Sequence, residues 1–158
     1  MPIDKDQFRA TLGRFASGIT IVTVRGADGR DHGMTVSAFT SLSLEPPLVL
    51  TCIARNASVF EHVVAASHVG INILAADQEA LSRRFASRDG DRFDGVGYAH
   101  GHTGVPLLDG ALASLECEVR ARHDGGDHVI VVGQVEHATV RDGHPIVYYR
   151  GGYASLAR

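Results

Sequence analysis

The last third of the chain alternates apolar and polar residues with a period of two, the pattern that most restricts its fold. In the segment ALASLECEVRARHD (111–124), apolar Leu115, Cys117 and Val119 alternate with polar residues. Such alternation is typical of a strand with one buried and one solvated face. A Gly-Gly-Asp turn (125–127) follows and leads into HVIVVGQVEHATV (128–140). The pattern therefore predicts a long antiparallel hairpin.

Other short apolar runs separated by turn residues extend this prediction. We expect strands at 19–24, 34–44, 48–54, 69–74 and 145–149, with hairpin turns at Asp28-Gly29 and Asp142-Gly143. Helices are predicted over 4–17, from a Ser58 cap to about residue 66, and from an Asp77 cap to about residue 86. Residues 87–105 read as a long loop. Many hairpins with few helices favour a mainly β fold, an antiparallel barrel rather than a doubly wound sheet.

Composition excludes several classes of protein. The chain has 158 residues, enough for one domain over 1–158, and a hydrophobic fraction of 44% argues against disorder. A net charge of −3 gives no basic surface for nucleic acid, and no apolar run is long enough to span a membrane. The N-terminus lacks the apolar segment of a signal peptide, and Cys52 and Cys117 read as isolated apolar residues. We therefore expect a cytoplasmic protein.

The segment 33–58 carries the strongest signal for a ligand. It runs GMTVSAFTSLSLEPPLVLTCIARNAS and combines small hydroxyl residues, a Pro-Pro break, a buried strand and a polar Arg-Asn-Ala-Ser loop. Small side chains leave backbone N–H and C=O groups open to a flat ligand, while hydroxyls and an arginine suit a phosphate. This order of residues suggests a flavin nucleotide along a strand edge, with its phosphate in the next loop.

Three other motifs are less specific. His128 opens a strand directly after the Gly-Gly-Asp turn, where it either faces a pocket, oriented by Asp127, or only completes the turn in solvent. Tyrosines at 148, 149 and 153 surround a Gly pair and either stack on a planar ligand or fill the core. His100 and His102 have a spacing suited to a metal but no third ligand nearby, so no metal is predicted. The motifs of Rossmann folds, P-loops, serine hydrolases and zinc proteases are missing from the sequence.

Together the ordered motifs resemble the flavin reductase-like family, the reductase components of two-component flavin monooxygenases. The similarity runs through FASGITIVTV, GMTVSAFTSLSLEPPLVLTCI, VGINILAADQEALSRRFA, LECEV, GGDHVIVVGQV and PIVYYRGGY, nearly the whole chain. The resemblance implies an FMN-binding, antiparallel Greek-key split β-barrel that forms a homodimer. It also implies hydride transfer from NADH or NADPH to FMN or FAD, and a separate monooxygenase that accepts the reduced flavin.

The same resemblance implies a set of site residues. The flavin ring would lie along Met34, Thr35, Val36, Ser37 and Ala38, with Ser41 and Ser43 close behind. The ribityl and phosphate groups would contact Cys52, Ile53, Ala54, Arg55, Asn56 and Ser58, and the helix end Arg84, Phe85 and Ala86 would close the site. His128 would lie at the nicotinamide, assisted by Asp127, and Tyr148, Gly151 and Tyr153 would shape that side.

Two alternatives stay open on the sequence. One is a non-catalytic flavin-binding protein with the same fold. The other is a split-barrel flavin oxidase that acts directly on a small substrate. The His128 turn and the absence of a Lys/Arg cluster for a second phosphorylated ligand disfavour it. Hydride transfer needs the nicotinamide and flavin rings aligned, so the main role expected of the protein is to position them.

Overall fold

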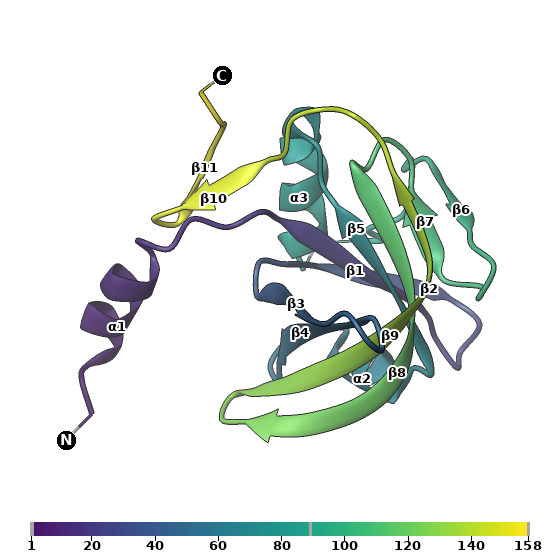
Figure 1. The fold of residues 1–158 in the computed structure, drawn as a ribbon, viewed down its shortest axis with the longest axis horizontal. Coiled ribbons are helices and arrows are strands. Elements are labelled where there is room, and N and C mark those ends of the chain that lie inside the picture. Colours follow the sequence, from purple (N-terminus) through teal and green to yellow (C-terminus); the bar gives the residue numbers. More distant parts are fainter. Residues whose placement is uncertain (1, 89, 158) are drawn as a thin grey trace.

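The architecture is a curved antiparallel sheet with helices at its margins (Figure 1). The computed structural model describes residues 2–88 and 90–157. One seven-stranded sheet has the spatial order β2-β1-β5-β8-β9-β4-β3. Its strands are β1 (Thr20–Arg25), β2 (Asp31–Val36), β3 (Phe39–Ser43), β4 (Leu48–Ala54), β5 (His68–Ile73), β8 (Ala113–Gly125) and β9 (His128–Val140). Two small antiparallel ladders pair β6 (Tyr98–His100) with β7 (Pro106–Leu108), and β10 (Val147–Tyr149) with β11 (Gly152–Ala154).

The prediction of a mainly β, antiparallel fold is confirmed, but the sheet is not a closed barrel. Its two edge strands are β2 and β3, which follow each other in the chain, and within the described residues no ladder joins them. An edge strand has backbone N–H and C=O groups on its outer side that no neighbouring strand satisfies. The open edge is therefore available to another partner.

The strand predicted over 34–44 is in fact two strands. β2 ends at Val36 and β3 begins at Phe39, because the backbone bends sharply at Ser37 and Ala38. The bend is held by hydrogen bonds from Phe39 N to Ser37 O (2.9 Å) and from Cys52 N to Ala38 O (2.9 Å). Ala38 is thereby tied to β4 rather than to β1.

The β8–β9 hairpin forms as predicted, whereas the hairpin expected at Asp142-Gly143 does not. Gly126 adopts a φ of +66°, which permits the tight turn between β8 and β9. After β9, Pro145 forms an isolated bridge with Ala75, and Ile146 N donates to Leu74 O, so the chain crosses to the end of β5 instead of pairing a new strand with β9. The following strand, β10, pairs with β11 beyond the Gly151 turn.

The helices are shorter than the sequence predicts. The first, α1 (Lys5–Leu12), begins at an Asp4 cap and ends at Gly13, because the chain then extends so that Ser17 can pair with Tyr148. The second, α2 (Phe60–Ala65), has Val59 at its N-cap rather than Ser58. The hydroxyl of Ser58 instead accepts a hydrogen bond from Arg92 (3.1 Å).

The third predicted helix begins as a 3₁₀ turn, η1 (Ala76–Gln78), and continues as α3 (Glu79–Ala86). Its predicted cap is wrong: Gln78 Oε1, not Asp77, accepts from the Ala75 amide at 2.9 Å. The predicted loop at 87–105 contains the short strand β6, which pairs with β7. None of the helices described combines the length and apolar character needed to cross a bilayer.

The core lies inside the curved sheet, and β1 contributes most continuously to it. Five consecutive residues of β1, from Thr20 to Val24, are buried, which confirms the prediction of a strand covered on both faces. Cys117 also lies in this core, where burial raises the pKa of its thiol to about 12. The thiol is thus protonated at neutral pH and packs as a small apolar group. Both cysteines are free.

Candidate active site

A cavity of about 890 Å³ lies beside the β2–β3 bend, between the sheet and α1. Figure 1 shows α1 standing off from the body of the molecule beside β10 and β11. The sheet side of the cavity comes from the β2–β3 bend and from β4, through Ser37, Ala38 and Cys52. Tyr148 and Gly151 close it near β10. A volume of this size suits a nucleotide-like ligand, since such pockets usually measure about 300–1,000 Å³.

Five of the residues predicted from the sequence line this cavity, although they are far apart in the chain. They are Ser37, Ala38, Cys52, Tyr148 and Gly151. Apart from Tyr148 their side chains are small, and Ala38 already accepts a hydrogen bond from the Cys52 amide. A flat ligand can therefore approach the backbone of the bend closely.

The register of the sheet brings the His128 turn to the same strand. Ala54, the last residue of β4, lies directly opposite His128, the first residue of β9. Cys52, two residues earlier on β4, lies opposite Ile130. β4 thus carries Cys52, which lines the cavity, and two residues further on Ala54, which faces His128 on the interior strand β9; only the sheet pairing creates this juxtaposition.

His128 is half exposed and is oriented by its neighbour. Its Nδ1 lies 2.7 Å from Oδ1 of Asp127, and this hydrogen bond is the main reason that the pKa of the Asp127 carboxyl is lowered. A carboxylate can only accept, so in the neutral imidazole Nδ1 carries the proton and Nε2 keeps its unshared pair. His128 itself does not line the 890 Å³ cavity.

A second, smaller cavity of about 280 Å³ contains Ser58, the predicted phosphate ligand. Its walls also include Arg88 and Arg92, from the segment that the sequence suggested was a loop. Arg92 donates to Gly33 O (2.6 Å), Ser87 O (2.8 Å) and Ser58 Oγ (3.1 Å). Burial, with a smaller effect of Arg88, lowers the pKa of Arg92. Two neighbouring guanidinium groups beside a serine hydroxyl favour an anion.

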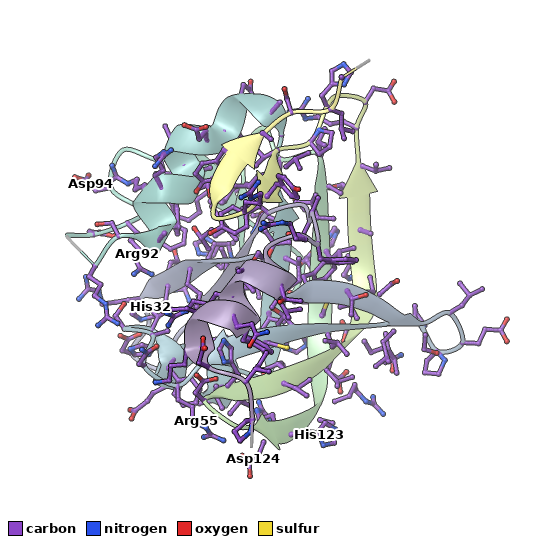
Figure 2. All side chains as sticks on the ribbon, turned by 90° about the vertical axis from the view of Figure 1, so that its left-hand side faces the viewer. His32, Arg55, Arg92, Asp94, His123 and Asp124 are labelled. Atoms are coloured by element: carbon purple, nitrogen blue, oxygen red, sulfur yellow. The ribbon has the colours of Figure 1, made fainter. Side chains whose placement is uncertain are left out.

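Arg92 was not predicted as a site residue. Its three acceptors come from β2, from the end of α3 and from the loop before α2, so no local spacing in the sequence signals their proximity. The only available signal was the arginine content of the 87–105 segment. Figure 2 shows Arg92 and His32 on the same side of the molecule.

Several other predicted residues are buried or form hydrogen bonds within the fold. The side chains of Ile53 and Phe85 are fully buried, and that of Val36 is 6% exposed. Thr35 Oγ1 donates to Ser82 O (2.6 Å) and therefore ties β2 to α3. The phenol of Tyr153 is 2.7 Å from the Ser82 hydroxyl. These side chains pack or form hydrogen bonds within the fold and thereby support the walls.

The remaining predicted residues lie around these walls. Met34 packs against the core, and Ser41 and Ser43 lie on the edge strand β3, where a bulge separates them. Arg84, at the end of α3 next to Ala86, donates to the carbonyls of Asp91, Arg92 and Asp94 and thereby fixes the loop that carries Arg92. Asn56 O accepts from Arg88 (2.9 Å).

The two histidines considered for a metal are held apart. His100 Nε2 contacts the carboxylate of Asp31 (3.0 Å), whereas His102 Nδ1 is 3.4 Å from Glu116. Each imidazole contacts a different carboxylate, so the two histidines are not arranged to bind one metal ion together.

These features define a class: a mainly β protein with a nucleotide-sized cavity at the bend between its two edge strands and a second, smaller pocket that contains arginines. Residues 12–157 match the family model described as the flavin reductase like domain. The chain belongs to the flavin reductase like family.

Individual relatives agree with this assignment. An NADH-dependent flavin reductase from Rhodococcus sp is 48% identical over 152 residues, covering 94% of this chain and 84% of the relative. The reductase subunit of a flavin-dependent monooxygenase from Rhodococcus jostii is 37% identical over 155 residues, covering 98% and 79%. The NADH:FAD oxidoreductase of Streptomyces globisporus, solved in complex with NAD and FAD fragments, superimposes with a TM-score of 0.92 at 38% identity, covering 98% and 93%.

Proposed function

We propose that this protein is an NAD(P)H:flavin oxidoreductase that reduces FMN or FAD and supplies the reduced flavin to a partner monooxygenase. The observation that carries the proposal concerns β4. This strand lines the cavity through Cys52, and its last residue, Ala54, lies opposite His128 of β9. The family assignment and the NADH-dependent relatives support the same chemistry.

In this proposal the flavin ring lies along the open edge of β2 and the bend at Ser37 and Ala38, as in an FMN-binding split barrel. The bound flavin supplies an acceptor for hydride. Outward-facing backbone amides of the edge strand would donate to the ring and stabilise negative charge on it. The Ser58 and Arg92 pocket would take the phosphate.

His128 is assigned the nicotinamide side. Asp127 holds the imidazole with the proton on Nδ1, so Nε2 is left to accept a hydrogen bond, for which the carboxamide N–H of a nicotinamide is suited. Such a contact contributes orientation rather than proton transfer, because hydride transfer requires no general acid.

The test follows NADH absorbance with FMN, FAD and riboflavin supplied in parallel, each repeated with NADPH. We expect flavin-dependent oxidation of the nicotinamide by the purified protein, with a preference among the three flavins. A protein that binds flavin but consumes neither nicotinamide would instead be the non-catalytic binder.

We also propose a homodimer, because within residues 2–88 and 90–157 the apolar side chains on and just after α1 stay largely exposed. Phe8 is 54%, Leu12 52% and Phe15 80% exposed, and all three line the 890 Å³ cavity. Apolar side chains gathered at one cavity are a common mark of a protein interface. A second copy seated against α1 would complete the wall of the flavin site.

The dimer proposal predicts that Phe15→Glu dissociates the protein, since a charge buried at an apolar interface is strongly unfavourable. Light scattering after size exclusion should give the mass of a dimer for the wild type and of a monomer for the variant. Val140→Glu serves as the control, because Val140 is equally exposed (85%) but lies outside this cavity. A monomeric wild type would contradict the proposal.

A further inference from the structure

Asp28, His32 and His62 converge beside the smaller cavity, although they come from a turn, a strand and a helix. Asp28 lies in the β1–β2 turn, His32 on β2 and His62 on α2. One donor atom from each lies within 4.8 Å of the other two. His32 and His62 also line the 280 Å³ cavity.

The cluster is closely packed. His32 Nε2 is 3.0 Å from Asp28 Oδ2, and the rings of His32 and His62 stack with centroids 3.7 Å apart and planes at 8°. The turn closes on these groups because residue 26 is glycine: a Cβ there would come within 2.5 Å of Asp28 Oδ1 and 2.9 Å of His32 Cδ2. The donor atoms of two imidazoles and one carboxylate thus lie close together.

We propose that these three residues bind a divalent transition-metal ion of the Zn²⁺ class. Two imidazoles and a carboxylate form a donor set that Zn²⁺ accepts, and a tetrahedral site needs donors about 3.3 Å apart at bond lengths of about 2.0–2.1 Å. Because imidazole lone pairs lie in the ring plane, coordination requires the two rings to rotate out of their parallel stack so that one nitrogen of each points at the ion.

The surroundings determine what would complete the coordination shell. Arg30, Arg88 and Arg92 line the same cavity together with Asp31 and Asp91, so charged groups of both signs would surround the ion. A site with one carboxylate ligand keeps a net charge of +1, and its open position facing the cavity therefore suits an anionic oxygen such as that of a phosphate.

The test titrates metal-free protein with Zn²⁺ by calorimetry, and with Co²⁺ by visible absorption, without flavin or NADH. We expect one ion per chain, and His62→Ala and Asp28→Asn should each weaken binding by about tenfold or more. The matched control is His68→Ala, which should bind Zn²⁺ like the wild type. It tests whether the ion binds instead at a second cluster, formed by His68, Glu118 and Glu136. Absence of Zn²⁺ binding by the wild type, or equal binding by His62→Ala and the wild type, would overturn the proposal.

A second, independent observation concerns Arg55, which contacts the tip of the β8–β9 hairpin at three points. Its backbone N–H donates to Asp127 O (2.9 Å). Its guanidinium donates from Nε to Gly126 O (3.1 Å) and from an Nη to Asp124 Oδ1 (2.6 Å). Figure 2 shows Arg55 and Asp124 side by side at the end of the hairpin.

These contacts span the turn that leads into His128. Asp124 is 91% and Asp127 94% exposed at their side chains, so the tip is surrounded mainly by solvent. Resting on the proposed function, we infer that Arg55 is a positioning residue for His128 and not a ligand of the flavin phosphate. Its donors are directed to the hairpin, and it does not line the pocket that holds Ser58 and Arg92.

Riboflavin separates the two roles because it lacks the phosphate. For Arg55→Ala we expect NADH-dependent reduction of FMN and of riboflavin to fall by the same factor, roughly tenfold, with an unchanged flavin dissociation constant. A loss confined to FMN would identify Arg55 as a phosphate ligand and overturn the inference. Unchanged rates with both flavins would overturn it as well.

Two further variants and one measurement without turnover complete the design. Arg55→Lys should reduce flavin faster than Arg55→Ala. Asp124→Asn, which changes the acceptor of the Arg55 guanidinium, should lose part of the wild-type rate. Amide hydrogen exchange at 124–128 should become faster in Arg55→Ala. If the wild type does not oxidise NADH, the proposed function fails. The exchange measurement still tests whether Arg55 holds the hairpin tip, and an unchanged exchange rate in Arg55→Ala would refute that role.

Discussion

Replacing His128 by alanine should slow NADH-dependent flavin reduction by about 100-fold while leaving the flavin dissociation constant unchanged. The reason is geometric: His128 opens β9 opposite the end of β4, and Asp127 fixes its ring at 2.7 Å. Loss of the imidazole would leave the flavin wall at Ser37, Ala38 and Cys52 intact but remove the group that orients the nicotinamide. Stopped-flow reduction of pre-bound flavin, with flavin binding followed by fluorescence, measures the two quantities separately.

Asp127→Asn provides the matched control for this prediction. The amide keeps the size of the side chain but removes the carboxylate that holds the proton on Nδ1 of His128. We expect a smaller rate loss than for His128→Ala, again without an effect on flavin binding. If His128→Ala reduced flavin as fast as the wild type, His128 would merely complete the turn.

Phe85→Ala should destabilise the fold by about 4 kcal/mol, because it empties a fully buried ring site. Phe85 packs edge-on against Phe93 at 5.0 Å, and its ring also lies under β2, where a Cβ on Gly33 would come within 2.9 Å of it. For a chain of this size we expect the melting temperature to fall by roughly 8–16 °C. Thermal unfolding followed by circular dichroism measures the change.

Two variants calibrate this second prediction. Phe85→Leu should lose only part of the stability because it refills most of the volume, and Leu44→Ala should change little because Leu44 is 85% exposed. The sequence resemblance gave Phe85 a role in closing the flavin site. A Phe85→Ala protein that melts like the wild type but binds flavin weakly would support that role instead of the core role.

Local patterns in the sequence were sufficient for much of the fold. The β-branched run at 19–24 became β1 (Thr20–Arg25), and the alternating segment at 111–124 became β8 (Ala113–Gly125), because both patterns depend on near neighbours in the chain. The errors arose where distant groups competed. Ser58 did not cap α2, because its hydroxyl accepts a hydrogen bond from Arg92. The strand expected at 34–44 divided into β2 and β3, because the carbonyl of Ala38 accepts a hydrogen bond from Cys52 N of β4.

Some residues of the candidate site could likewise be predicted from the sequence, whereas others could not. Motif order was enough to point to Ser37, Ala38, Cys52, Tyr148 and Gly151, which the fold gathers around one cavity. The contribution of Arg92 and the true contacts of Arg55 could not be read from spacing, since each bridges segments that are distant in the chain. The stack of His32 on His62 likewise depends on how α2 packs against β2.

By itself, therefore, the sequence determined most strands of the large sheet, most of the turns and the family of this protein, because periodicity and turn chemistry act over a few residues. The tertiary structure decided which of those residues meet. The sheet remained open between β2 and β3, its register set Ala54 against His128, and long arginine side chains joined the loops. Strand pairing and side-chain hydrogen bonds act between residues distant in sequence but close in space, so only the folded chain could show the arrangement of the site.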